Sequence, residues 1–243
     1  MSALLEVKNV TKRFFGFTAL GDVNVTIQAG DRIGLIGPNG SGKTTLINCV
    51  SGVFKPEVGT IRFLGDDISS LAPHRRAKKG LARTFQIPRP FSSMSVEDNL
   101  MVPLEYVVHD LIDLTNETAV YDEARELLRR VRLDDRKGAF ANDLSQVELR
   151  KLELARAIAA RPQLLICDEA MAGLATKEVN EILDILLDLN ASGITIVMVE
   201  HIMQAVMRFS KRIICLSAGR VISDGAPAEV MAHPDVRRAY LGS

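Results

Sequence analysis

Hydrophobic and polar residues alternate at the start of the chain and then give way to short apolar runs. Residues 4–14 (LLEVKNVTKRF) alternate with a period of two, which indicates a strand with one buried face. Residues 31–37 (DRIGLIG) form an apolar run that ends in glycine-rich sequence, and residues 44–52 (TTLINCVSG) have a helical pattern. Residues 59–68 (GTIRFLGDDI) indicate a further strand. The first part of the chain therefore predicts strands and one early helix.

From about Pro88 to Arg161 helical patterns dominate, as in residues 96–108 and 121–133. Two apolar runs rich in β-branched residues follow, at residues 163–170 (QLLICDEA) and 194–201 (ITIVMVEH). Continuous apolar runs of this kind are typical of parallel strands that are buried on both faces.

The last part of the chain predicts a hairpin and then helix. Residues 212–225 contain two strand-like runs around Ala218-Gly219, and residues 226–243 predict one or two short helices. The whole pattern indicates a parallel α/β core, residues 1–87 and 161–243, with a helical insert at about residues 88–160. At 243 residues the chain is expected to form a single domain.

Composition narrows the class of protein. Lys plus Arg and Asp plus Glu both number 30, so the formal net charge is zero and nucleic acid is not an expected partner. No apolar run approaches the length of a membrane span, and the N-terminus lacks the pattern of a signal peptide. The three isolated cysteines show no metal-ligand spacing and are expected to be buried thiols in a reducing cytosol.

The stretch GPNGSGKTT fits the phosphate-binding pattern G-x-x-x-x-G-K-[ST] without a mismatch, between a predicted strand and a predicted helix. Its glycines let successive backbone N–H groups point at phosphate oxygens, and the helix N-terminus adds partial positive charge. Lys43 is expected to reach the β- and γ-phosphates as a catalytic residue, and the Thr44 hydroxyl to ligate Mg²⁺. The expected ATP-binding residues here are Gly37, Pro38, Asn39, Gly40, Ser41, Gly42, Lys43, Thr44 and Thr45.

Acidic residues and a histidine end the two apolar runs. Asp168 is expected to hold Mg²⁺, and Glu169 to polarise the attacking water as a general base. His201, after the second run, is expected to hydrogen-bond the γ-phosphate or that water. The carboxyl ends of strands are where α/β sheets bind their ligands, which favours a site over a pair of helix caps.

In order and spacing these motifs resemble the nucleotide-binding domain of ABC transporters, over essentially the whole chain. The resemblance implies an ABC ATPase: a P-loop NTPase with a RecA-like parallel-sheet core, an antiparallel β subdomain and an inserted α-helical subdomain, using ATP and Mg²⁺. It implies that Phe14 stacks on adenine, with Phe15 and Phe17 as rival candidates. It also implies that Gln86 senses Mg²⁺ and the γ-phosphate and couples to a membrane subunit.

Two longer stretches of sequence, ARTFQIPRPFSSMSVEDNL and the C-terminal DGAPAEVMAHPDVRRAYLG, resemble the ATPase subunits of branched-chain amino acid importers. The resemblance implies integral membrane permease subunits, a second ABC ATPase subunit and, indirectly, a substrate-binding protein, with this chain peripheral on the cytoplasmic face of the cell membrane. The alternatives are lipopolysaccharide export, a nucleotide-binding module without useful hydrolysis, and a soluble ABC ATPase that works on DNA or ribosomes.

The signature motif departs from the pattern of the family, in which it caps the ATP of a partner ATPase. Residues 144–148 read LSQVE, without glycine. Ser145 and Glu148 form the pattern of a capping box, so a helix is expected to begin here. Val147 is expected to obstruct a phosphate, and Glu148 to repel one by about 1 kcal/mol or more. The resemblance implies that Gln146 and these residues face the partner's ATP. Ala175, in the loop after Asp168 and Glu169, stands where the family usually has Asp or Asn and cannot hydrogen-bond across the dimer. An asymmetric pair of ATPases is therefore expected, with an altered signature that still works as the alternative.

Overall fold

The computed structural model describes residues 3–108 and 117–241, and the chain divides into two compact units. The first unit combines Met1–Arg76 with Thr195–Ser243, and the second is Ala77–Ile194. The division expected from sequence, at residues 87 and 161, concerns subdomains of one cassette and stays a prediction.

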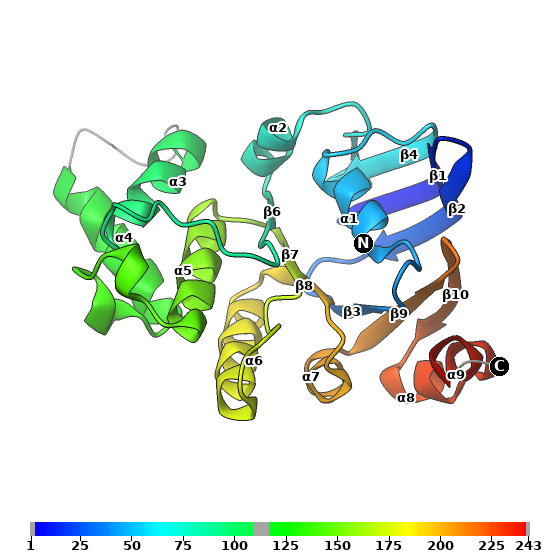
Figure 1. Cartoon of the computed structure of the whole chain (residues 1–243). Helices are drawn as coiled ribbons and strands as arrows, with labels where there is room; N and C mark the ends of the chain where they lie inside the picture. Colours follow the sequence, from blue (N-terminus) through cyan, green and yellow to red (C-terminus); the bar gives the residue numbers. More distant parts are fainter. Residues whose placement is uncertain (1–2, 109–116, 242–243) are drawn as a thin grey trace. The chain divides into compact units, whose positions relative to one another are not determined.

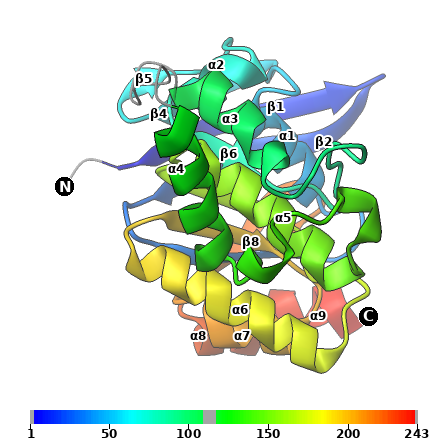
Figure 2. The ribbon, with the colours of Figure 1, turned by 90° about the vertical axis from the view of Figure 1, so that its left-hand side faces the viewer.

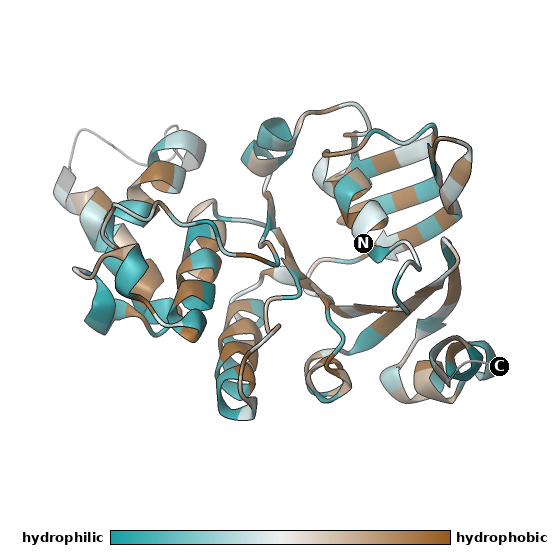
Figure 3. Cartoon of the chain, viewed as in Figure 1, coloured by the Kyte–Doolittle hydropathy of each residue, from teal (hydrophilic) through white to brown (hydrophobic). Residues whose placement is uncertain are grey.

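An antiparallel sheet forms one half of the first unit. Its strand order is β2-β1-β4-β5, and β1 pairs with both β2 and β4. Hydrophobic and hydrophilic residues alternate along β1, β2 and β4 (Figure 3), as expected for strands with one buried face. The strands are β1 (Leu5–Phe14), β2 (Phe17–Ile27), β4 (Val58–Phe63) and β5 (Asp66–Asp67).

The expected strand over residues 59–68 is wrong, because the structure has a hairpin there. β4 ends at Phe63 and β5 begins at Asp66, and these two residues pair antiparallel. Leu64 and Gly65 between them have φ values of 54° and 84°. Two consecutive residues with positive φ make the tight turn that reverses a strand.

The first unit also contains a mostly parallel sheet around β3 (Figure 1). β3 pairs parallel with β8 and β9, while β10 returns antiparallel along β9. Ala218 and Gly219 form the turn of this hairpin with φ values of 46° and 74°, which confirms the hairpin expected there. The strands are β3 (Arg32–Ile36), β8 (Thr195–Val199), β9 (Arg212–Ser217) and β10 (Arg220–Gly225).

Five helices accompany these sheets in the described part of the chain: α1 (Lys43–Ser51), α2 (Pro73–Lys78), which runs across the boundary between the units, α7 (Met203–Phe209), α8 (Pro227–Ala232) and α9 (Pro234–Leu241). Val206, Val230 and Val236, from α7, α8 and α9, are buried together with Ile36 at the end of β3. Packing of these helices therefore supports the strand that leads into the glycine-rich loop.

The second unit joins two parallel strands to a group of helices. β6 pairs parallel with β7, and Figure 2 shows α3, α4 and α5 side by side, as their mutual contacts also indicate. A helical segment was expected here, and α3 tolerates an internal Pro103. The elements are β6 (Leu81–Arg83), β7 (Leu164–Asp168), α3 (Asp98–Val108), α4 (Glu117–Arg130), α5 (Gln146–Ala159) and α6 (Thr176–Ala191).

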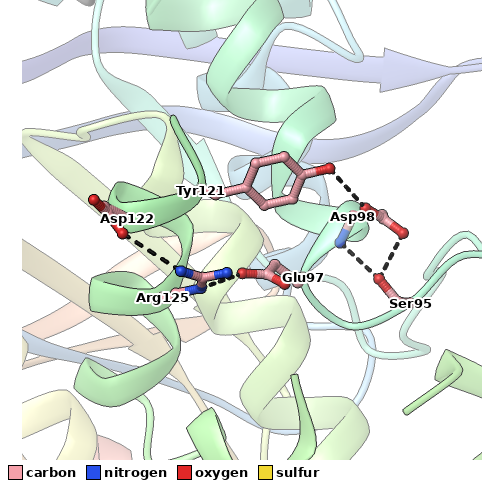
Figure 4. Close-up of polar contacts among 6 residues, drawn as sticks. All are labelled: Ser95, Glu97, Asp98, Tyr121, Asp122 and Arg125. Atoms are coloured by element: carbon pink, nitrogen blue, oxygen red, sulfur yellow. Dashed lines mark hydrogen bonds and ion pairs between the residues drawn. The ribbon is translucent and has the colours of Figure 1, made fainter. Parts of the chain in front are cut away.

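Polar contacts fix the start of α3 against α4 (Figure 4). The Asp98 backbone N–H donates to Ser95 Oγ at 3.0 Å, and this hydroxyl donates to the Asp98 carboxylate at 2.6 Å. Tyr121 on α4 donates to Asp98, and Arg125 on α4 donates to Glu97 at 2.7 Å. These contacts satisfy polar groups at a helix end that lacks intrahelical partners.

The three cysteines are buried, as expected. In the described ranges, no helix is both long and apolar enough to cross a membrane.

Candidate functional site

The glycine-rich loop connects the buried strand β3 to helix α1, whose first residue is Lys43. Gly37 has a φ of 150°, and a Cβ on it would lie 2.2 Å from the Leu216 carbonyl oxygen. At Gly42, with a φ of 105°, a Cβ would lie 2.9 Å from the Ala19 carbonyl oxygen. Both positions therefore require glycine, and the loop can wrap closely around an anion at the start of α1.

Lys43 places a buried positive charge inside this loop. Its side chain is only 6% exposed, and its Nζ donates to the carbonyl oxygens of Gly37 at 2.7 Å and Pro38 at 3.1 Å. Thr44, the next residue, is exposed at the first turn of the helix. A buried cation, a helix N-terminus and a hydroxyl at the same loop fit a nucleotide phosphate with its Mg²⁺.

The three aromatic candidates for adenine stacking lie where β1 turns into β2. Phe14 packs edge-on against Phe54, with ring centroids 5.2 Å apart, and the Lys12 ammonium lies 5.1 Å from the Phe14 ring centroid. Phe15 and Phe17 are exposed and make the turn and the start of β2. Phe14 is thus held in a defined position, whereas its two rivals extend into solvent.

At the end of β8, His201 is exposed and the neighbouring Glu200 is buried. Glu200 is 3% exposed, and its carboxylate accepts the backbone N–H of His201 at 3.3 Å. The His201 side chain is exposed in the first unit. Glu200 therefore helps to fix the backbone from which His201 projects.

In the second unit, Asp168 ends strand β7 and is 7% exposed. Its carboxylate forms an ion pair with the guanidinium of Arg83 on the neighbouring strand, at 2.7 Å. The Asp168 backbone N–H donates to Thr84 Oγ1 at 3.3 Å. Arg83 and Thr84 were not singled out from sequence, and only the pairing of β6 with β7 brings them to Asp168.

The expected general base and the expected sensor residue meet directly. Gln86 Nε2 donates to the Glu169 carboxylate at 2.6 Å. Glu169 has a φ of 48°, a backbone conformation that non-glycine residues seldom adopt and that often marks functional positions. The structure thus brings these two predicted residues together and holds Glu169 at a sharp turn after β7.

Within the described residues, no group of three or more His, Cys, Asp or Glu side chains could hold a metal ion by itself. Mg²⁺ is commonly bound by one or two protein oxygens together with phosphate oxygens and water. In the first unit the exposed Thr44 hydroxyl is an oxygen ligand of the kind that fits such an ion, and in the second unit the Asp168 carboxylate is another.

Helix α5 begins at Gln146 with Ser145 as its N-cap, which confirms the expected capping box. The Ser145 backbone N–H donates to the Glu148 carboxylate at 2.7 Å, and Arg136 lies 3.2 Å from the same group. Burial raises the pKa of Glu148, but the Ser145 hydrogen bonds and the nearby Arg136 and Lys151 outweigh burial and lower it overall. The carboxylate is therefore charged, tied to its own helix and partly neutralised.

A row of polar side chains on α5, which the sequence analysis did not single out, holds the segment around Gln86. Arg150 donates to the Phe85 carbonyl oxygen at 3.2 Å, and Glu153 accepts the Phe85 backbone N–H. Arg156 donates to the Arg89 carbonyl oxygen at 2.6 Å. Since these residues recur every three positions on a helix, their polarity along one face was the available signal.

The two units thus carry a phosphate-binding loop before a helix and a pair of acids at the end of a buried strand, which define a P-loop nucleotide-binding protein. The family model described as ABC transporter matches residues 20–172, and that of the branched-chain amino acid ATP-binding cassette transporter matches residues 220–243. The chain belongs to the ABC transporter family of ATP-binding proteins, and it is an ATPase of the kind whose hydrolysis is coupled to transport.

Individual relatives are similar over their full length. The chain is 35% identical to the high-affinity branched-chain amino acid transport ATP-binding protein BraF of Pseudomonas aeruginosa, covering 98% of both chains. It is also 35% identical to the lipopolysaccharide export system ATP-binding protein LptB of Escherichia coli, covering 99% of this chain and 98% of LptB. The ADP conformation of MJ1267, an ATP-binding cassette, matches with a TM-score of 0.88 at 29% identity, covering 100% of both chains. These relatives confirm the expected fold.

Proposed function

We propose that this chain is the ATP-hydrolysing subunit of an importer for branched-chain or other amino acids. The observation that carries the proposal is the C-terminal segment, because residues 220–243 match the branched-chain amino acid cassette while residues 20–172 match ABC transporters in general. Identity alone does not separate the two transport systems, since BraF and LptB are equally identical to this chain.

Uptake by the reconstituted transporter tests the substrate. The chain is purified with its membrane subunits, placed in lipid vesicles with ATP inside, and supplied with radiolabelled leucine, isoleucine or valine and a substrate-binding protein. ATP-dependent accumulation supports the proposal. ATP hydrolysis that responds to lipopolysaccharide and to none of the amino acids would instead favour the export system.

In the proposed reaction, the loop over residues 37–45 binds the ATP phosphates and Lys43 stabilises the charge that develops on the γ-phosphate. Phe14 contacts adenine, and its edge-on contact with Phe54 supports this assignment because it fixes the ring. Glu169 accepts a proton from the attacking water as the general base. His201 orients the water or the γ-phosphate.

Mg²⁺ is proposed to bind at Thr44, Gln86 and Asp168, where it would neutralise phosphate charge. The 2.6 Å hydrogen bond between Gln86 and Glu169 supports a role for Gln86 in controlling the base. While this bond exists, one carboxylate oxygen of Glu169 is engaged, so a shift of Gln86 would free that oxygen to contact the attacking water.

Membrane permease subunits are the proposed partners, with the chain peripheral on the cytoplasmic face of the cell membrane and a substrate-binding protein engaged indirectly. Hydrophobic side chains exposed around Gln86 support this proposal: Phe85 is 51%, Ile87 70% and Phe91 39% exposed. An exposed apolar group of this kind is typical of a surface that another protein covers.

We further propose that this chain works in an asymmetric pair with a second ABC ATPase. Val147 and Glu148 stand where the partner's ATP would meet the start of α5, whereas the expected residues for this chain's own ATP are present. A specific observation favours a second possibility, that the altered signature still works: the capping box is intact and Arg136 neutralises Glu148.

Two variants of the assembled transporter separate these possibilities. In the asymmetric pair, Glu169→Gln lowers transport-coupled ATP hydrolysis by about 100-fold or more, because it removes a general base. Val147→Gly then raises hydrolysis, because it restores close approach at the partner's ATP. Unchanged hydrolysis in Glu169→Gln would contradict the asymmetric pair. If Val147→Gly leaves hydrolysis unchanged, the altered signature already works.

A further inference from the structure

A tyrosine near the C-terminus touches the first glycine of the phosphate-binding loop. The backbone N–H of Gly37 donates to the Tyr240 hydroxyl at 2.7 Å, across 203 residues of sequence. Gly37 itself is buried. Because a buried backbone N–H without a partner is costly, this hydrogen bond stabilises the loop at Gly37.

The last two helices hold Tyr240 at this place. Val230 on α8 and Val236 on α9 are each 1% exposed and pack in one cluster with Ile36, the residue before Gly37, and with Cys215 on β9. Figure 1 shows α8 and α9 beside the hairpin of β9 and β10 at the end of the chain. The cluster therefore anchors α9 to the strands that lead into the loop.

Gly37 is held from both sides. Its carbonyl oxygen accepts a hydrogen bond from the Lys43 ammonium at 2.7 Å, and its N–H donates a hydrogen bond to the Tyr240 hydroxyl. A side chain is excluded at this position, since a Cβ on Gly37 would lie 2.2 Å from the Leu216 carbonyl oxygen. The orientation of both peptide groups at Gly37 thus depends on one residue of the loop and one residue of the tail.

We propose that Tyr240 is a positioning residue that keeps the phosphate-binding loop in the shape described above through the Gly37 N–H. A preformed loop loses less conformational freedom when it binds phosphate, so this hydrogen bond strengthens nucleotide binding without touching the nucleotide. The proposal rests on the assignment of residues 37–45 as the ATP site. It gives a role to the same C-terminal segment that distinguishes this group of cassettes.

The phenol is suited to this task because it stays neutral. Tyr240 is 40% exposed, and burial of the rest of the residue raises its pKa to about 12, with nearby Cys215 raising it further and the Gly37 hydrogen bond lowering it. The hydroxyl therefore keeps its proton at any pH at which the protein works, and its oxygen remains available to accept the Gly37 N–H.

The test is Tyr240→Phe in the full chain, which keeps the ring and removes only the hydroxyl. Titration calorimetry measures the binding of MgADP and of a non-hydrolysable ATP analogue, and steady-state kinetics in the assembled transporter separate KM from kcat. We expect nucleotide affinity to fall by about 2- to 10-fold, the range that one net hydrogen bond gives, with kcat nearly unchanged. Tyr106→Phe, at a tyrosine that is 75% exposed on α3, is the matched control and leaves affinity unchanged.

The outcomes separate two failures. If the unaltered chain binds no nucleotide, or Lys43→Ala binds it as well as the unaltered chain, the assignment of the ATP site is wrong. If Lys43→Ala loses binding while Tyr240→Phe binds nucleotide with the affinity of the unaltered chain, the positioning role alone is overturned. Tyr240 then only anchors the C-terminal helix.

Amide hydrogen exchange provides a measurement that does not depend on the variant folding. The proposal requires the Gly37 N–H of the unaltered chain to be protected before nucleotide is added. An amide at Gly37 that exchanges as fast as an exposed loop amide overturns the proposal, whatever Tyr240→Phe does.

Discussion

Arg76 is a buried residue whose charged side chain hydrogen-bonds the C-terminal end of α1, the helix that starts at the phosphate-binding loop. It is 1% exposed, and its guanidinium donates to the carbonyl oxygens of Cys49 and Val50, each at 2.7 Å. It donates further to Leu71 at 2.9 Å and to Ser69 at 3.2 Å. Burial lowers its pKa, yet arginine keeps its proton, so the four carbonyl groups are what makes this burial tolerable.

Replacing Arg76 with methionine tests this role. Arg76→Met keeps much of the volume and leaves the carbonyl groups without a donor, so the free energy of unfolding is expected to fall by about 3 kcal/mol. Urea unfolding measures the change. Arg75→Met, at the exposed neighbouring position, is the matched control and changes stability by less than about 0.5 kcal/mol. Equal effects of the two substitutions would contradict the capping role.

The effects of Glu148 and Val147 on transporter ATP hydrolysis can be measured separately. The Glu148 carboxylate already binds the Ser145 N–H and pairs with Arg136, so it offers less repulsion to a phosphate than an isolated carboxylate would. Glu148→Gln keeps an acceptor for the cap, and we expect it to change transporter ATP hydrolysis by less than about 5-fold, since a partly exposed ion pair is worth about 1 kcal/mol or less. A larger gain than that of Val147→Gly would show that charge, rather than bulk, limits the altered signature.

At the scale of elements, α5 joins its own N-terminus to the segment that carries Gln86. Arg150 and Glu153 bind the carbonyl and the N–H of the same residue, Phe85. Arg150 also donates to the Ala172 carbonyl oxygen, which lies in the loop after Glu169. The helix that presents the signature therefore contacts both segments that position the Gln86–Glu169 pair.

Glu153, on α5, makes the stability of the protein depend on pH. Burial is the largest cause that raises its pKa from 4.5 to about 6; Asp168 also raises it, while the Phe85 N–H, Arg150 and Arg156 lower it. Because the folded pKa exceeds the unfolded one, its contribution to stability is complete below pH 4.5 and is lost as the pH rises through about 6.

Glu153→Gln removes this titration and keeps an acceptor for the Phe85 N–H. Relative to the unaltered chain, the variant is expected to gain about 2 kcal/mol of unfolding free energy between pH 4.5 and pH 7. Chemical unfolding at several pH values measures the difference. The matched control is Glu126→Gln on α4, whose side chain is 57% exposed and which should show no such gain. A difference that does not change with pH would mean that Glu153 titrates normally.

Sequence patterns predicted the elements whose signals are local. The capping box at Ser145 and the turn at Ala218-Gly219 depend on residues within a few positions, and both are present in the structure. The strand β2 carries a similar alternating pattern, although no strand was expected there. The hairpin at Leu64-Gly65 has no such local signal, because leucine rarely adopts a positive φ.

Contacts between distant residues could not be predicted in this way. The Arg83–Asp168 ion pair and the Tyr240–Gly37 hydrogen bond join residues far apart in sequence, and only strand pairing or helix packing brings them together. Motifs in the sequence indicated the candidate site residues, whereas the contacts that position them depend on which distant segments the fold brings together.

At the scale of the whole molecule, an asymmetric pair makes this chain dependent on its partner. In the proposed function, the loop over residues 37–45 and Glu169 act on this chain's own ATP, and the signature of a second ATPase caps that ATP. Two copies of this chain could offer each other only the altered sequence at Val147 and Glu148. The pure chain should therefore bind MgATP and hydrolyse it slowly.

Adding the partner ATPase together with the membrane subunits is expected to raise hydrolysis per chain by at least about 10-fold, because capping the phosphates adds donors that act in the transition state. Glu169→Gln in this chain should abolish the gain, which assigns it to ATP bound here rather than to the partner's own ATP. Hydrolysis is followed by phosphate release at saturating ATP, over a range of chain concentrations. If the pure chain reaches the rate of the complete transporter as its concentration rises, two copies of it form working sites, and the altered signature is sufficient for hydrolysis.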